Sequence, residues 1–84
     1  MKTQEIEAQS VQVGMKIMDR VVDSRDPRVG ALVVKTVISV KQLPDDLSGW
    51  TFINCIPDEP DWKGERGQGG PCKLNRSLVT ILAD

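Results

Sequence analysis

The chain has 84 residues, of which 39% are hydrophobic and 27% are charged, and it contains no histidine. This length makes one domain, and the balance of apolar and charged residues is typical of a globular protein rather than a disordered one. The net charge of −1 excludes a polycation that binds nucleic acid through its overall charge. The lack of histidine excludes Ser-His-Asp and Cys-His catalysis and nearly every zinc site built with imidazole.

The first predicted strand covers residues 11–18, where apolar residues alternate with polar residues or glycine. A period of two is typical of a strand with one buried face. A short run, "RVV" at 20–22, follows, and the turn-forming residues of "DSRDPR" at 23–28 end it. A long β-branched run then predicts a strand over 32–42.

The second half of the chain continues this pattern. "PDDLSG" predicts a turn, "WTFINCI" predicts a strand over 50–56, and the last strand is expected over 77–82. Between these two strands, the proline- and glycine-rich segment "PDEPDWKGERGQGGP" predicts a long loop at about 57–72. About five strands within a single domain spanning 1–84 predict an all-β fold, a small curled sheet or barrel with one long Gly/Pro-rich loop.

The strand alternation also predicts which side chains form the core. Trp50 and Phe52 share a face of their strand, and both are expected to be buried; the alternative is an exposed aromatic platform. The residues expected to be mostly buried are Val13, Ile17, Val33, Val37, Phe52, Ile53, Val79 and Ile81.

The two cysteines, Cys55 and Cys72, cannot form a disulfide framework, although one bridge between them is possible. The chain opens without a signal-peptide pattern, and no apolar run reaches membrane-spanning length. We therefore expect a cytoplasmic protein with two free thiols and no membrane partner.

Several short motifs resemble a known group of proteins. The motifs "V-x-V-G" at 11–14, "D-x-R-D-P-R" at 23–28, Gly30 followed by "V-V-K-T-V", and "K-L-N-R-S-L" at 73–78 together resemble small, uncharacterised phage and prophage proteins. Residues 14–37 are more weakly similar to the nucleic-acid-associated module called KOW, and the order of strands and loops resembles an SH3-like barrel. The resemblance implies a small β-barrel, a phage-encoded origin and a location in the host cytoplasm, without implying an activity.

The glycine-rich segment 62–76 lacks the Lys-Ser or Lys-Thr that completes a phosphate loop, and it also misses the dinucleotide-binding pattern. Its basic residues would attract an anion or an acidic partner, and Trp62 would stack on a base or fill a partner's pocket. The alternative is a loop whose Trp62 folds back over the end of the barrel. The predicted partner-binding residues of the whole chain are Arg25, Arg28, Trp62, Lys63, Arg66, Lys73 and Arg76.

The "DPR" turn has two interpretations. Arg25 and Arg28 would clamp a phosphate or an acidic partner, or Asp26 and Arg28 would pair across the turn and hold it. Arg76 would meet Asp23 or Asp26 if the first and last strands adjoin.

The acidic clusters 45–46 and 58–61 contain the carboxylates that a divalent cation or an acid/base pair would need. They stand beside prolines in turns, where acids are commonly solvated, so we expect no metal, no cofactor and no catalysis. The sequence predicts a non-enzymatic binding module, a phage-encoded accessory protein that engages a host or viral protein through its loops. The alternative is a nucleic-acid-binding SH3-like or KOW-type module that uses the basic segments 20–41 and 63–76. A homo-oligomer is compatible with either.

Overall fold

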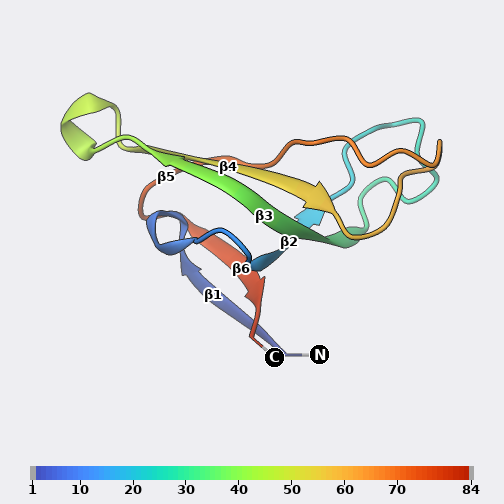
Figure 1. The fold of residues 1–84 in the computed structure, drawn as a ribbon, viewed down its shortest axis with the longest axis horizontal. Helices are drawn as coiled ribbons and strands as arrows, with labels where there is room; N and C mark the ends of the chain where they lie inside the picture. The colour runs from blue at the N-terminus through green and yellow to red at the C-terminus, as the bar shows by residue number, and fades with distance from the viewer. Residues whose placement is uncertain (1, 84) are drawn as a thin grey trace.

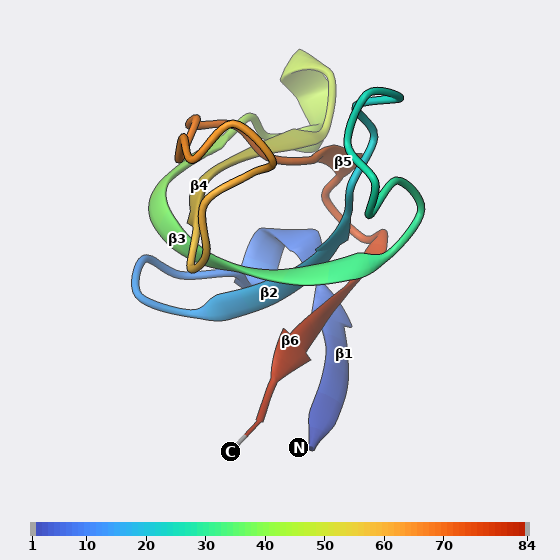
Figure 2. The same cartoon turned by 90° about the vertical axis from the view of Figure 1, so that its right-hand side faces the viewer.

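The computed structural model describes residues 2–83, which form one antiparallel sheet with the strand order β1-β6-β2-β3-β4-β5 (Figure 1). The sheet curls around its core, but β1 and β5 remain open edges, so it does not close into a barrel (Figure 2). The predicted all-β curled sheet is confirmed. The strands are β1 (Thr3–Glu7), β2 (Lys16–Arg20), β3 (Leu32–Gln42), β4 (Trp50–Pro57), β5 (Cys72–Leu74) and β6 (Leu78–Leu82), and the two short 3-10 helices are η1 (Ala8–Ser10) and η2 (Asp45–Leu47).

The first predicted strand, 11–18, is wrong in its first half, because β2 begins only at Lys16. Gly14 has a φ of 94°, a left-handed conformation that turns the chain before the strand starts. The short run 20–22 is not a strand of its own, since Arg20 belongs to β2. The strand β1 was not expected, because "TQEIE" is mostly polar; it forms by backbone pairing with β6 along its whole length.

The predicted strand 32–42 matches β3, and the predicted strands 50–56 and 77–82 match β4 and β6 to within one residue at an end. The long loop is also present, as residues 58–71 between β4 and β5. It lies beside the loop 21–31 at one end of the sheet, on the right in Figure 1, while η2 lies at the opposite end.

The core contains five of the eight residues expected there, namely Ile17, Val37, Ile53, Val79 and Ile81, together with Ala8, Val11 and Cys55. Val33 is half-buried. The predicted burial of Val13 and Phe52 is wrong, since their exposed fractions are 64% and 42%, and Trp50 is also exposed, at 36%. Val13 lies in the turn before β2. On β4, the alternate residues 51, 53 and 55 face inward, so period two puts 50 and 52 on the outer face.

Both cysteines are free: the Cys55 side chain is buried on the inner face of β4, and Cys72 is exposed on β5. Burial raises the pKa of the Cys55 thiol to about 11, because a thiolate would lose its solvation there. The Cys55 side chain therefore acts as a small apolar filler of the core rather than as a reactive thiol.

Gly70 marks a close approach of the loop 58–71 to β4. A Cβ atom at this position would collide with the carbonyl oxygen of Ile53 and lie 3.1 Å from the Cys55 Sγ. We expect Gly70→Ala to lower the free energy of unfolding by about 1–3 kcal/mol in urea denaturation, because the segment must move off β4. Gly67→Ala is the matched control, since its Cβ would meet nothing within 4 Å. Equal stabilities of the two variants would contradict this account.

Candidate binding site

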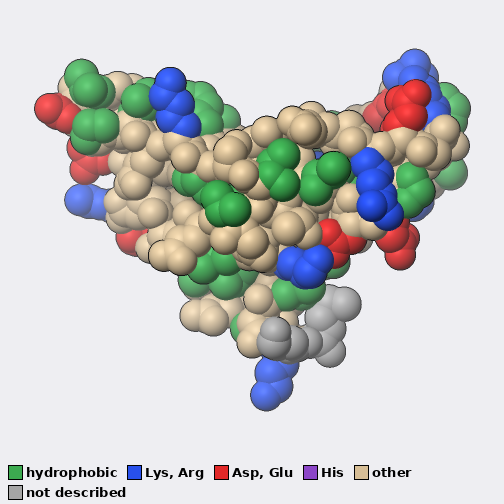
Figure 3. Space-filling model, viewed as in Figure 1, with side chains coloured by type: hydrophobic (Ala, Val, Ile, Leu, Met, Phe, Trp, Pro, Cys, Tyr) green, Lys and Arg blue, Asp and Glu red, His purple; other side chains and the backbone are tan. Residues whose placement is uncertain are grey.

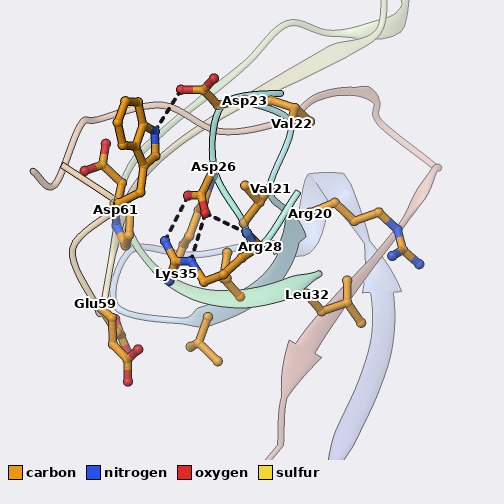
Figure 4. A pocket seen from close by; sticks show the side chains of 15 residues that line it. Arg20, Val21, Val22, Asp23, Asp26, Arg28, Leu32, Lys35, Glu59 and Asp61 are labelled. Atoms are coloured by element: carbon orange, nitrogen blue, oxygen red, sulfur yellow. Dashed lines mark hydrogen bonds and ion pairs between the residues drawn. The ribbon is translucent and has the colours of Figure 1, made fainter. Parts of the chain in front are cut away.

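The buried carboxylate of Asp26 organises the loop 21–31. Its Oδ1 accepts a hydrogen bond from the Arg28 backbone N–H at 2.8 Å, and the Arg28 guanidinium donates to its two oxygens at 3.3 and 3.1 Å (Figure 4). Because these bonds stabilise the charged forms, the pKa of Asp26 lies below its ordinary value and that of Arg28 lies above. The structure thus shows the pair that would hold the turn.

Trp62 joins the second loop, 58–71, to the first loop, 21–31. Its indole N–H donates to Asp23 Oδ2 at 3.4 Å, and the cations of Arg25 and Lys63 lie 5.6 and 5.2 Å from its ring centroid. Both distances are within the range of a cation–π attraction. Arg25 also donates from its Nε and Nη2 to the Asp23 carboxylate, and these bonds hold the pKa of that carboxyl well below its usual range. Trp62 folds back over the first loop and still keeps 44% of its surface exposed.

The loop 58–71 is held in the same way by Asp61. Its Oδ1 accepts hydrogen bonds from the backbone N–H groups of Lys63 and Glu65, at 2.8 and 2.9 Å. Between the two loops, the Arg28 guanidinium donates a hydrogen bond to the carbonyl oxygen of Pro60 at 3.4 Å. The sequences Asp-Ser-Arg, Asp-Pro-Arg and Asp-Trp-Lys therefore use one device, an aspartate that accepts the backbone N–H two residues ahead.

Asp58 fixes the point at which the second loop leaves β4. Its carboxylate accepts hydrogen bonds from the Lys16 ammonium and the Thr36 hydroxyl, both at 2.6 Å. The hydrogen bond from Lys16 is the main reason that the pKa of Asp58 lies below its ordinary value. The loop therefore starts from a position tied to both β2 and β3.

A pocket of about 480 Å³ lies between the two loops. Several apolar side chains at its surface are not covered: Val22 is 87% exposed and Leu32 is 52% exposed. Charged side chains of both signs gather at this end of the molecule, at the upper right in Figure 3. The apolar residues that line the pocket are Val21, Val22, Leu32, Val33, Val34, Pro57 and Trp62.

Of the seven predicted partner-binding residues, the structure brings four together on the two loops, Arg25, Arg28, Trp62 and Lys63, and of these Arg28 and Trp62 line the pocket. Arg66 is exposed in the same loop. Lys73 lies on β5 and lines a second hollow of about 400 Å³ next to β2 and β6, which shares Arg20 and Leu32 with the pocket.

Arg76 is placed elsewhere, and its expected pairing with Asp23 or Asp26 is wrong. Its Nη2 lies 3.6 Å from Asp45 Oδ2, at the η2 end of the sheet. The predicted first and last strands correspond to β2 and β6, which are neighbours in the sheet. They pair only at Ile17 and Ile81 and then diverge around the hollow beside Lys73. This divergence carries the turn before β6 away from the loop 21–31.

Sequence reasoning missed the apolar part of the pocket. Val21 and Val22 belong to the short run 20–22, and Leu32 belongs to the predicted strand 32–42, so the signal available was apolar residues on either side of a highly polar turn. The pocket itself requires two loops far apart in the chain to meet, and no local pattern encodes that.

Within residues 2–83, no three side chains of the metal-ligating types converge on one point. The same residues include no helix with the length and apolar character needed to cross a membrane. Comparison of the chain with protein-family models, curated proteins and solved structures gave no match. Inference about function therefore rests on the pocket and its loops.

Proposed function

We propose that this protein is a non-enzymatic binding module that takes apolar side chains of a partner protein into the pocket between its two loops. The observation that carries the proposal is the exposed apolar lining, since Val22, Leu32 and Trp62 all line the pocket and are all uncovered. Uncovered apolar surface with polar residues around it is typical of a protein interaction site. The resemblance to small phage proteins supports a phage-encoded accessory role in a host cytoplasm.

The loops are suited to binding because their own hydrogen bonds fix them. Asp23, Asp26 and Asp61 each hold the backbone of their loop, and Trp62 and Arg28 tie the two loops together. Loops that are already ordered lose little conformational entropy when a partner binds. More of the energy gained by covering the apolar lining is then available as affinity.

The charges support a protein partner over nucleic acid. In the basic segment 20–41, Arg25, Arg28 and Lys35 each form an ion pair with an aspartate, so their charge is already neutralised. A phosphate would have to displace a carboxylate from each of them. Nucleic-acid binding depends on cations that are free to neutralise phosphates.

Trp62→Ala tests this proposal. Binding to a protein recovered from nuclease-treated extract of the source organism is expected to weaken about 30-fold, equivalent to about 2 kcal/mol for a buried interface anchor. The matched control is Trp50→Ala, since Trp50 has a similar exposed fraction, 36% against 44%, but lies on the outer face of β4. This control should leave the affinity unchanged.

Affinity measured by calorimetry at two salt concentrations completes the test. A protein partner predicts a weak dependence on salt. Loss of the partner after nuclease treatment would contradict the proposal. So would a log–log salt slope of about −0.9 per phosphate contact together with an indifferent Trp62.

A further inference from the structure

The acidic residues of the pocket are not all neutralised. Asp23, Asp26 and Asp58 are paired with Arg25, Arg28 and Lys16, but Glu59 and Asp61 form no ion pair with any side chain in residues 2–83. Asp61 uses only Oδ1 for its two backbone hydrogen bonds. Two carboxylates at the pocket therefore remain available to an incoming cation.

The basic residues of the pocket do not cancel this charge locally. Arg28 and Lys35 are committed to Asp26 and Asp19. Arg20 donates to the carbonyl oxygen of Gly30 at 2.7 Å, and its guanidinium points away from the side that carries Glu59 and Asp61 (Figure 4). Five acidic and three basic side chains line the pocket, and the wall at Glu59 and Asp61 is therefore acidic, whereas Lys63 and Arg66 of the same loop do not line it. A phosphate or carboxylate beside Glu59 and Asp61 would be repelled.

The same wall already attracts cations. The ring of Trp62 has Arg25 and Lys63 within cation–π distance, and the pKa of both Arg25 and Arg28, raised first by their own aspartates, is raised further by Asp61. Across the pocket from this wall lie the apolar side chains of Val22 and Leu32 (Figure 4). Lysine and arginine side chains match such a surface, because an aliphatic stem packs on apolar groups while the charged head meets carboxylates.

We infer that the partner segment presents a lysine or arginine next to apolar side chains, an inference that rests on the proposed function. The cationic head lies against Glu59 and Asp61, and the apolar neighbours cover Val22 and Leu32. The pocket thereby selects basic, amphipathic segments of a protein and rejects acidic ones.

Three blocked hexapeptides, Gly-Leu-X-Leu-Ser-Gly with X as lysine, glutamine or glutamate, test the inference. The protein used is Trp50→Phe, in which Trp62 is the one tryptophan and its fluorescence reports binding. The lysine peptide is expected to bind about five-fold more tightly than the glutamine peptide, and the glutamate peptide about ten-fold more weakly than the lysine peptide, as suits partly exposed charge pairs.

Glu59→Gln and Asp61→Asn identify the carboxylates responsible. Each should lower the ratio of the lysine-peptide affinity to the glutamine-peptide affinity about two-fold. The amide oxygen of Asp61→Asn can still accept the two backbone hydrogen bonds, so the loop is expected to keep its shape. The control is Glu5→Gln on β1, an exposed glutamate that does not line the pocket.

The outcomes separate the inference from the function on which it rests. Equal affinity for the lysine and glutamine peptides, or a lysine preference that survives both Glu59→Gln and Asp61→Asn, overturns the inference and leaves an apolar protein-binding pocket. If no hexapeptide alters Trp62 fluorescence while an oligothymidylate of eight nucleotides does so in a strongly salt-dependent way, both the inference and the proposed function fail.

Discussion

Ile17→Ala is expected to lower the free energy of unfolding by about 2–5 kcal/mol, the range for emptying a buried aliphatic site. The Ile17 side chain is fully buried, and its residue is also the single pairing point between β2 and β6, opposite Ile81. A cavity here therefore weakens the contact that attaches the β1–β6 pair to the rest of the sheet. Urea denaturation followed by circular dichroism gives the value.

Two further variants calibrate this result. Ile17→Val removes one methylene group and should cost about 0.5–1.5 kcal/mol. Val13→Ala should cost less than about 0.5 kcal/mol, because Val13 is 64% exposed in the turn before β2. A cost for Val13→Ala as large as that for Ile17→Ala would show that residues 11–15 pack as a strand of the core.

Asn75→Ala is expected to cost about 2–4 kcal/mol, since it leaves inward-facing polar groups without partners. The Asn75 side chain is buried; its Oδ1 accepts the Thr51 hydroxyl at 2.8 Å and its Nδ2 donates to the carbonyl oxygen of Leu43 at 3.0 Å. One amide thus joins the turn before β6 to β4 and to the end of the β3–β4 hairpin. Thermal and urea denaturation measure the loss.

The matched control for this network is Asn54→Ala. Asn54 is half-buried on β4 and makes a single long hydrogen bond, 3.4 Å, to the Gln68 side chain, so its loss should cost less than about 1 kcal/mol. Asn75→Ala leaves the Thr51 hydroxyl without its acceptor, and Thr51→Val removes that hydroxyl. The double variant should therefore lose less stability than the sum of the two single variants. Strict additivity would mean that the Thr51–Asn75 hydrogen bond contributes nothing.

The strands β3, β4 and β6 were predictable because β-branched residues are dense in all three. The orientation of β4 was not, since either alternate set of its residues reads as a buried face. Trp50 and Phe52 are the more hydrophobic set, yet Thr51, Ile53 and Cys55 face inward. Which face is buried depends on the direction in which the whole sheet curls, and that is a property of all its strands together.

In the candidate site, too, contacts between residues close in sequence were predictable and contacts between distant residues were not. The pairing of Asp26 with Arg28 follows from residues two apart in a turn, and the sequence suggested it as one of two interpretations. The contact of Trp62 with Asp23 joins residues far apart in the chain, and Glu59 lines the same pocket as Asp23. Local spacing carries no information on such a meeting, because it follows from the length and register of the strands between the loops.

The open sheet leaves β1 and β5 with unpaired backbone groups along one side, and such edges can recruit strands of other molecules into aggregates. Both edges are short, since β1 has five residues and β5 has three. The edge strand β1 carries Glu5 and Glu7, so a like strand added beside it would bring carboxylates together. Short length at both margins, and like charge along β1, disfavour growth of this open sheet into a fibre.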